Sequence, residues 1–292
     1  MSGRELKVGI MFANSGPLAA PDAAVAMAET AEAAGVESLW TVEHVVIPRG
    51  YESQYPYNAS GRAPAAESSD IPDPLIWLAF VAARTTRIKL ATGILILNQR
   101  QPLVVAKEIA TLDQLSRGRV MLGVGSGWLK EEFDALGVPF DDRGDRLDDH
   151  IAALRAVWRD GRDGASHASR FTVFDECISR PVPPAGSVPI VIGGHTKRAA
   201  RRAGELGDGF FPGKGSPAEL TELLELMRAH ATTAGRDPDA IELTTFIRNR
   251  DETQRLIDIG FTRFTIPPPT YDIDAFGPAM RQAMERAQAT LG

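Results

Sequence analysis

The amino-acid sequence predicts an α/β protein, a (β/α)₈ TIM barrel with an insertion after the second strand. Short apolar runs alternate with amphipathic helical patterns along the 292 residues, and about eight such pairs fit in that length. The runs are apolar almost throughout, which is typical of parallel strands that are covered on both faces. A doubly wound open sheet would show the same alternation and is the structural alternative.

The predicted strands are short apolar runs bounded by polar or turn-forming residues. They cover residues 6–12, 38–43, 89–97, 119–127, 188–192, 209–212, 241–247 and 263–267. One helix should begin at Pro102, which suits a first helical position, and end at Gly118. Apolar residues at helical spacing predict further helices over 147–158 and after Pro217. We expect a single domain over residues 1–292, because no linker or repeat interrupts this order.

Two segments break the alternation of strands and helices. Residues 48–74, after the second strand, are rich in Pro, Gly, Ser and Tyr, and residues 159–186 read as an irregular excursion before the fifth strand. Long loops of a barrel often act as lids when they lie at strand ends. We therefore expect both segments near the ends of barrel strands.

The composition excludes several classes of protein. Acidic residues outnumber basic ones, 38 to 32, and binding of nucleic acid needs a concentrated basic face. No segment approaches the ~20 apolar residues of a membrane span, and no signal peptide is recognisable. Cys177 is the single cysteine, so no intrachain disulfide can form, and no spacing typical of a metal site occurs. We expect a cytoplasmic protein that binds no metal, membrane or nucleic acid.

The stretch VMLGVGSGW contains three glycines, as do some catalytic and nucleotide-binding loops. A nucleophile elbow is excluded, because Val124 and Trp128 stand where that motif requires glycine. The spacing of Gly123, Gly125 and Gly127 also differs from the dinucleotide-binding fingerprint. Glycines at alternate positions share one face of a strand, so we interpret them as room for a flat ligand at its carboxyl end. Tight packing or a bulge is the alternative.

The fifth predicted strand runs into Gly193, Gly194, His195 and Thr196 before a helix. Exposed backbone N–H groups at a helix N-terminus, with Thr196 as the cap, form a good phosphate site. Positive charge follows at Lys197, Arg198, Arg201 and Arg202. A helix that is simply capped is the alternative.

Three segments together resemble a known family. They are SLWTVEHVVIP, the stretch from IKLATGILILNQ to VMLGVGSGW with EEFDALGVPF after it, and PVPPAGSVPIVIGGHTKRAARRAGELGDGFF. They resemble the luciferase-like family of flavin and deazaflavin (coenzyme F420) oxidoreductases, which are TIM barrels. The resemblance implies a bulge behind the cofactor ring at Thr92, Gly93 and Ile94, with a cis peptide at Gly93–Ile94. It also implies that Gly125, Ser126 and Gly127 lie beside the ring or ribityl chain, and that residues 193–196 hold the phosphate.

The resemblance also assigns roles to residues that follow the second and sixth strands. His44 matches a histidine that gives or takes a proton in some deazaflavin-dependent members, a role that the imidazole group suits. A polar residue on the barrel rim, or a stacking contact to the ring, is the alternative for His44. Glu43 stands where many relatives carry Asp, in the cofactor site. Lys214 falls where some sugar-phosphate-oxidising relatives direct a lysine toward the substrate.

Trp128 departs from the pattern of the deazaflavin sugar-phosphate dehydrogenases, some of which have a catalytic Glu there. Tryptophan cannot transfer that proton but offers a stacking face and one N–H donor. The sequence therefore predicts a different substrate, larger or more apolar. Tyr51, Tyr55 and Tyr57 of the insertion either line the same pocket or belong to a mobile loop.

The expected function is transfer of a hydride between coenzyme F420 and an unidentified organic small molecule. The first alternative is an FMN-dependent monooxygenase, which would need a flavin reductase as a partner. The second is a barrel that binds flavin or deazaflavin without catalysis. The resemblance also implies a homodimer.

Overall fold

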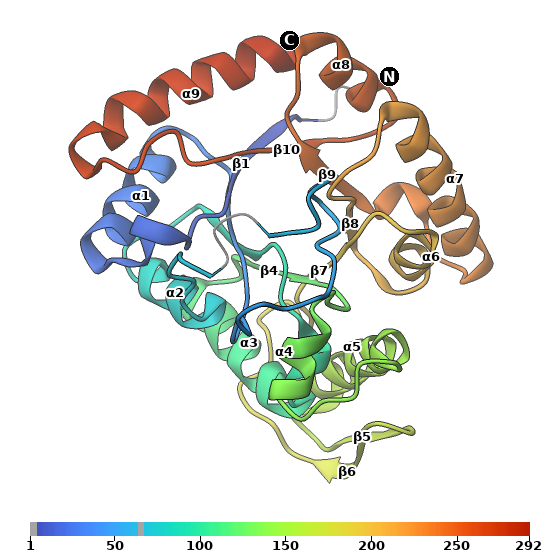
Figure 1. Cartoon of the computed structure of the whole chain (residues 1–292). Helices are drawn as coiled ribbons and strands as arrows, with labels where there is room; N and C mark the ends of the chain where they lie inside the picture. Colours follow the sequence, from blue (N-terminus) through green and yellow to red (C-terminus); the bar gives the residue numbers. More distant parts are fainter. Residues whose placement is uncertain (1–4, 64–66) are drawn as a thin grey trace.

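The computed structural model describes residues 5–63 and 67–292 and contains a closed barrel of eight parallel strands. Around the barrel the strands follow the order β1, β10, β9, β8, β7, β4, β3, β2 (Figure 1). They are β1 (Lys7–Met11), β2 (Ser38–Thr41), β3 (Lys89–Thr92), β4 (Val120–Val124), β7 (Ile190–Gly193), β8 (Gly209–Phe211), β9 (Glu242–Phe246) and β10 (Arg263–Ile266). The predicted barrel is confirmed and the open sheet is wrong.

Each predicted strand is present but shorter than its apolar run. The difference is largest for β3 and β4, whose runs continue into loops at the carboxyl ends of the strands. After β3 the loop residues Leu95, Ile96 and Leu97 are apolar because neighbouring segments cover them, not because they extend the strand. An apolar run therefore overestimates the length of a barrel strand here.

Helices surround the barrel (Figure 1). They are α1 (Pro21–Ala33), α2 (Pro74–Ala82), α3 (Pro102–Ser116), α4 (Lys130–Ala135), α5 (Arg143–Asp160), α6 (Lys197–Leu206), α7 (Pro217–Thr233), α8 (Arg250–Asp258) and α9 (Phe276–Leu291). The helix predicted at Pro102 begins there, and it ends where Arg117 and Gly118 take positive φ angles of 60° and 78°. Within the described ranges, no helix has the length and apolar character needed to cross a membrane.

Two clusters of buried side chains lie on opposite faces of the strands. The outer cluster packs between strands and helices and includes Ile10, Leu39 and Leu122. The inner cluster consists of Met11, Trp40, Ala91, Met121, Val191 and Phe211, which alternate along the strands with outer residues. Side chains thus fill the inside of the barrel, so a ligand has to bind above them at the carboxyl ends.

The segment before β7 is not the irregular excursion that the sequence predicts. It contains an antiparallel hairpin of β5 (Ala165–Ala168) and β6 (Val173–Cys177). The hairpin lies outside the barrel beside α5 (Figure 1). His167 Nε2 on the hairpin is 2.7 Å from Asp149 Oδ1 on α5. Its strands are short and mostly exposed, so they lack the apolar runs that revealed the barrel strands. Its turn approaches the start of α5, where Arg146 stacks on Phe171.

Candidate active site

The chain bulges where β3 ends. The Gly93–Ile94 peptide is cis, as the resemblance predicts. Gly93 N donates to Thr41 O at 2.6 Å, and Leu95 N donates to Gly123 O at 2.8 Å, so the bulge is tied to both neighbouring strands. Ile94 is thereby directed toward β4 and β7.

The glycines of β4 and β7 accommodate this bulge. A β-carbon at position 125 would lie 1.8 Å from Ile94 Cδ1, and one at position 193 would lie 2.7 Å from Ile94 Cγ2. At position 123 it would lie 1.9 Å from the carbonyl oxygen of Thr92. Gly123 and Gly125 therefore make room for the β3 bulge, as in the tight-packing alternative, while the contact of Gly125 and Gly127 with a cofactor stays a prediction. Gly127 lies beyond the strand, with a φ of 76° that favours glycine.

His44 lies three residues beyond β2 and contacts a carboxylate of α4. Its Nδ1 is 2.9 Å from Glu132 Oε2. The other oxygen of Glu132 accepts hydrogen bonds from Val45 N at 2.6 Å and Val46 N at 3.2 Å. The side chain of Glu132 is 1% exposed and that of His44 is 15% exposed. Sequence reasoning missed Glu132, although an acid between Leu129 and Phe133, both buried, is an unusual position that could have drawn attention.

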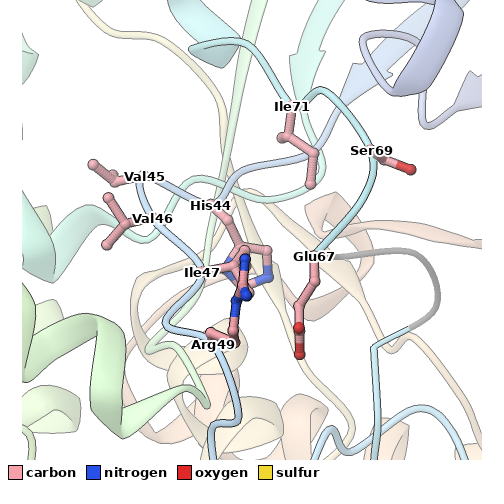
Figure 2. A pocket seen from close by; sticks show the side chains of 8 residues that line it. All are labelled: His44, Val45, Val46, Ile47, Arg49, Glu67, Ser69 and Ile71. Carbon is pink, nitrogen blue, oxygen red and sulfur yellow. The ribbon is translucent and has the colours of Figure 1, made fainter.

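His44 also lines a cavity of about 480 Å³ (Figure 2). Its other lining residues are Val45, Val46, Ile47, Arg49, Glu67, Ser69 and Ile71. Four of these are aliphatic and two carry opposite charges. The cavity therefore combines four aliphatic side chains with one imidazole, one hydroxyl and two charged groups.

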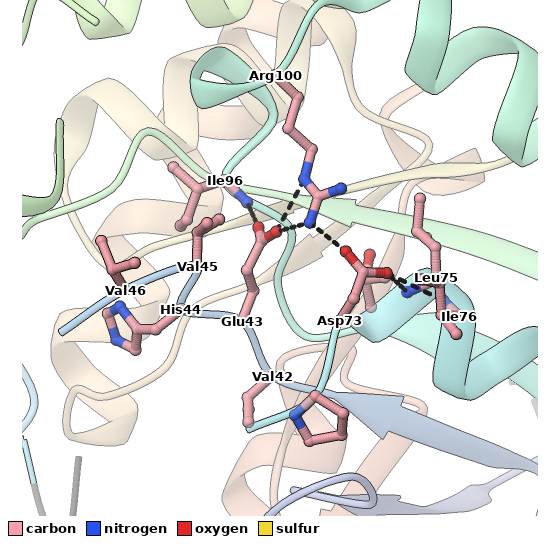
Figure 3. A network of polar contacts seen from close by, with 12 residues as sticks. Val42, Glu43, His44, Val45, Val46, Asp73, Leu75, Ile76, Ile96 and Arg100 are labelled. Carbon is pink, nitrogen blue, oxygen red and sulfur yellow. Dashed lines mark hydrogen bonds and ion pairs between the residues drawn. The ribbon is translucent and has the colours of Figure 1, made fainter. Parts of the chain in front are cut away.

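Glu43 does not lie in the cavity with His44. Its carboxylate accepts hydrogen bonds from Ile96 N at 2.5 Å and Arg100 Nε at 2.8 Å (Figure 3). Arg100 also pairs with Asp73 at 2.7 Å. Burial raises the pKa of Glu43, against the opposing effect of the Arg100 charge.

The structure places Glu43 in a network of ion pairs and hydrogen bonds, and its contact with a cofactor stays a prediction. Both of its oxygens are occupied, and the side chain is buried. Asp73, the next member of the network, caps α2 by accepting from Leu75 N and Ile76 N. Glu43 thus joins the end of β2 to the loop after β3 and to the start of α2, which holds the neighbouring His44 in place.

Aromatic rings follow one another from His44 to the start of α6. The ring of Trp128 lies edge-on to His44, with centroids 5.7 Å apart. Tyr51 and Tyr55 also contact Trp128, at 5.4 Å and 5.1 Å. The series continues from Tyr55 to Tyr57 at 5.4 Å and from Tyr57 to His195 at 5.0 Å. The tyrosines of the insertion therefore surround Trp128 instead of lying on a detached loop.

The insertion is fastened at one end by α4. Glu131 accepts hydrogen bonds from Glu52 N at 2.7 Å and Ser53 N at 3.0 Å. Burial opposes the ionisation of Glu131, but the hydrogen bonds from Ser53 and Glu52 outweigh it and lower its pKa to about 2. This carboxylate is therefore charged throughout the neutral range, and it holds the first part of the insertion.

The loop after β8 fastens the other end of the insertion. Lys214 Nζ donates to the carbonyl oxygen of Pro56. Tyr57 packs on Gly213, where a β-carbon would lie 2.4 Å from its ring. The structure thus places the ammonium of Lys214 on the insertion, and not on the cavity that contains His44. The insertion spans the barrel mouth, because it contacts segments that follow β4, β7 and β8.

The start of α6 has the features of an anion site. Thr196 Oγ1 accepts from Ala199 N at 3.2 Å, which confirms the predicted cap. Nδ1 of His195 is buried and has no hydrogen-bond partner among the described residues. Burial and the charge of Lys214 lower the pKa of His195. Gly194 has a φ of 120°, which other residues rarely adopt.

Some of the arginine side chains near the start of α6 form ion pairs with a carboxylate, and others form none within the described part of the chain. Arg201 and Arg202 both pair with Asp148, so they stabilise the contact between α5 and α6. Arg143 donates to Gly127 O at 3.3 Å, and burial and the nearby charge of Arg198 lower its pKa. Two guanidinium groups that repel each other beside a helix N-terminus favour a bound anion. Arg143 is a second residue that sequence reasoning missed.

His44, the bulge and the start of α6 all lie at the carboxyl ends of the barrel strands, which is the arrangement of a TIM-barrel enzyme. A model of the family described as luciferase-like monooxygenase matches residues 7–251. The chain therefore belongs to the luciferase-like monooxygenase family, and the resemblance found in the sequence is confirmed.

Individual relatives agree with this assignment. An uncharacterized protein of Mycobacterium tuberculosis is 31% identical over 243 residues, which are 82% of each chain. The F420-dependent glucose-6-phosphate dehydrogenase of Nocardia farcinica is 35% identical over 207 residues, which are 67% of this chain and 60% of that protein. The crystal structure of a monooxygenase from Streptomyces bottropensis has the same fold, with a TM-score of 0.76 at 22% identity over 98% of this chain and 100% of that one.

Proposed function

We propose that this protein is an oxidoreductase that transfers a hydride between coenzyme F420 and an organic small molecule, with His44 as its acid–base residue. The observation that carries the proposal is the position of His44. It lines a cavity formed by the segment that follows β2 and contacts a buried carboxylate. The choice of F420 over FMN is supported by the relative from Nocardia farcinica, whose name states dependence on F420.

The residues at the end of β3, β4 and β7 fit a cofactor with a phosphate group. We assign cofactor contacts to the bulge, the glycine loop and the α6 start, namely Thr92, Gly93, Ile94, Gly125, Ser126, Gly127, Gly193, Gly194, His195 and Thr196. The unpartnered Nδ1 of His195 and the repelling pair Arg143 and Arg198 support a phosphate there. When bound, the deazaflavin would supply the hydride chemistry.

The chain itself would bind the substrate, exclude water and move one proton. In the oxidation of an alcohol, His44 takes the hydroxyl proton, and in the reduction of a carbonyl it returns that proton to the oxygen. The insertion over the barrel mouth excludes water from this step. Its two attachments, at Glu131 and Lys214, keep it in place.

The substrate proposed here is larger or more apolar than a sugar phosphate. Trp128, Tyr51 and Tyr55 form an aromatic wall next to His44, and four of the eight side chains that line the cavity are aliphatic. Aromatic and aliphatic walls favour apolar ligands of matching shape. Lys214 is held by Pro56 in this arrangement, so we assign it to the insertion and not to substrate contact.

A titration with two cofactors tests the proposal. F420 and FMN are added separately to the protein, and binding is followed by the change in their absorption. We expect F420 to bind, and its reduced or oxidised form to react in a screen of apolar alcohols and ketones. FMN binding with oxygen consumption would favour the monooxygenase instead, with a separate reductase as its partner. F420 binding without any turnover would favour the binding protein, and binding of neither would overturn the proposal.

We also propose that the protein is a homodimer. Ile76 and Phe80 on α2 are 73% and 47% exposed, and Val104 and Leu115 on α3 are 53% and 73% exposed. Exposed apolar side chains gathered on neighbouring helices are typical of an interface between protein chains. Sedimentation of the wild type and of Leu115→Glu tests this, because a monomeric wild type would contradict it.

A further inference from the structure

Glu132 contacts Nδ1 of His44, the proposed acid–base residue. We infer that Glu132 is a positioning residue, which keeps the proton of neutral His44 on Nδ1 and leaves Nε2 as the nitrogen that exchanges a proton with the substrate. This inference rests on the proposed function for the role of Nε2. The tautomer that it assigns is a property of the protein alone.

Three consecutive residues contact the carboxylate of Glu132, two of them as backbone N–H donors. His44 Nδ1 lies 2.9 Å from Oε2, while Val45 N and Val46 N lie 2.6 Å and 3.2 Å from Oε1. An ionised carboxylate only accepts hydrogen bonds, so the proton between it and the imidazole belongs to Nδ1. The hydrogen-bond partner of Nδ1 thus decides which of the two ring nitrogens of neutral His44 carries the proton.

The surroundings of His44 leave its ring one orientation. Trp128 lies edge-on to it with an interplanar angle of 88°, and Glu132 holds Nδ1 on another side. A ring flip would break the bond to Glu132 and leave a buried carboxylate oxygen without that donor, which is costly. Because His44 also lines the cavity, the nitrogen that is free of Glu132 is the one available to a ligand there.

Charged groups on the cavity side do not compete for Nδ1. Arg49 and Glu67 line the same cavity, and neither forms an ion pair or hydrogen bond with His44 among the described residues. Glu43, the preceding residue, is occupied by Ile96 and Arg100. In Figure 3 its carboxylate points toward Arg100, while the ring of His44 points away. Glu132 is therefore the carboxylate that sets the tautomer.

The substitution Glu132→Gln separates this role from a structural one. The amide oxygen of glutamine still accepts from Val45 N and Val46 N, so the turn after β2 keeps those bonds. The amide nitrogen is a donor, and opposite Nδ1 it requires an unprotonated nitrogen there. The proton of neutral His44 should then move to Nε2.

The experiment is ¹⁵N NMR of the imidazoles in protein without cofactor, at a pH where they are neutral. The chain has five histidines, and the resonances of His44 are assigned by their loss in His44→Asn. We expect the Nδ1–H form in the wild type and a reversal to the Nε2–H form in Glu132→Gln. Glu205→Gln is the matched control, because Glu205 contacts His230 Nδ1 at the same 2.9 Å on the surface. It should leave the His44 resonances unchanged.

Two results would overturn the inference. One is an Nε2–H form of His44 in the wild type, which needs no variant and so does not depend on folding of Glu132→Gln. The other is an unchanged tautomer in a folded Glu132→Gln protein. Failure of F420 to bind would contradict the proposed function while leaving the tautomer assignment intact, so the two failures are distinguishable.

Discussion

The molecule contains two histidine–glutamate pairs of the same length in opposite environments. In both, the imidazole Nδ1 lies 2.9 Å from a carboxylate oxygen. The side chains of His230 and Glu205, on α7 and α6, are 33% and 30% exposed, whereas those of His44 and Glu132 are 15% and 1% exposed. Water competes for the surface pair, so it contributes little to stability.

The buried pair differs in what surrounds it more than in its own geometry. Glu132 has two further donors from the backbone, and His44 is confined by Trp128, whereas the further partner of Glu205 is the partly exposed side chain of Arg201. A buried carboxylate without partners is costly, so each of these contacts restricts how the pair can move. The distance between the two groups therefore does not separate the pairs, while their burial does.

The largest expected effect is on turnover when His44 is replaced. His44→Ala should lower kcat by about 10²–10⁴-fold, because it removes the group that transfers the proton. Binding of F420 should stay close to that of the wild type. Steady-state kinetics with the best substrate of the screen, and a parallel F420 titration, measure the two effects. His230→Ala is the control and should keep wild-type turnover. Equal turnover of the two variants would contradict an acid–base role for His44.

Glu132→Gln should produce the next largest effect. We expect kcat to fall by about 10²-fold, less than for His44→Ala, because the imidazole remains but carries its proton on the wrong nitrogen. KM should change little, since no substrate contact is removed. The same kinetics on Glu205→Gln provide the reference. A change in KM with kcat preserved would contradict a positioning role.

Truncation of the two glutamates should affect stability unequally. Glu132→Ala leaves the N–H groups of Val45 and Val46 without their partner, and it should lower the free energy of unfolding by about 1–3 kcal/mol. Glu205→Ala should change it by no more than about 0.5 kcal/mol, because both side chains are accessible to water. Urea denaturation of both variants measures the difference. Equal losses would mean that burial does not separate the pairs.

The smallest effect concerns the pH dependence of cofactor binding at His195. Burial and Lys214 lower the pKa of His195, so it is mostly neutral at pH 7 before binding. A bound phosphate would raise that pKa, and a group whose pKa rises on binding makes binding tighter as the pH falls. A rise of one unit corresponds to about tenfold in Kd at low pH. Titrations across the neutral range should show this trend in the wild type, and a flatter one in His195→Gln.

The barrel could be predicted from local patterns. Its strands are apolar on both faces, and its helices begin at residues such as Pro102 and Thr196 whose side chains suit a helix start. These signals depend only on residues that are close in the sequence, so they can be recognised without knowledge of the fold. The β5–β6 hairpin was missed because its strands are mostly exposed.

The site could be predicted only in part. The resemblance placed His44 near the cofactor region and predicted the cis peptide at Gly93–Ile94, which the structure confirms. It could not show that Glu43 is occupied by Arg100, since the two lie 57 residues apart in the chain. Nor could it show that the glycines make room for Ile94, because that contact depends on how β3, β4 and β7 lie side by side.

The sequence by itself determined the class of fold, the family and the residue types available at the barrel mouth. Only the tertiary structure decided which of several acidic residues contacts His44. Glu132 is 88 residues from His44 along the chain, and it reaches Nδ1 because β2 and the loop after β4 end at the same edge of a closed barrel. Spacing in the sequence carries no information about such a contact. Closure of the sheet brings Glu132 and His44 together, and their burial restricts the other partners that either side chain can reach.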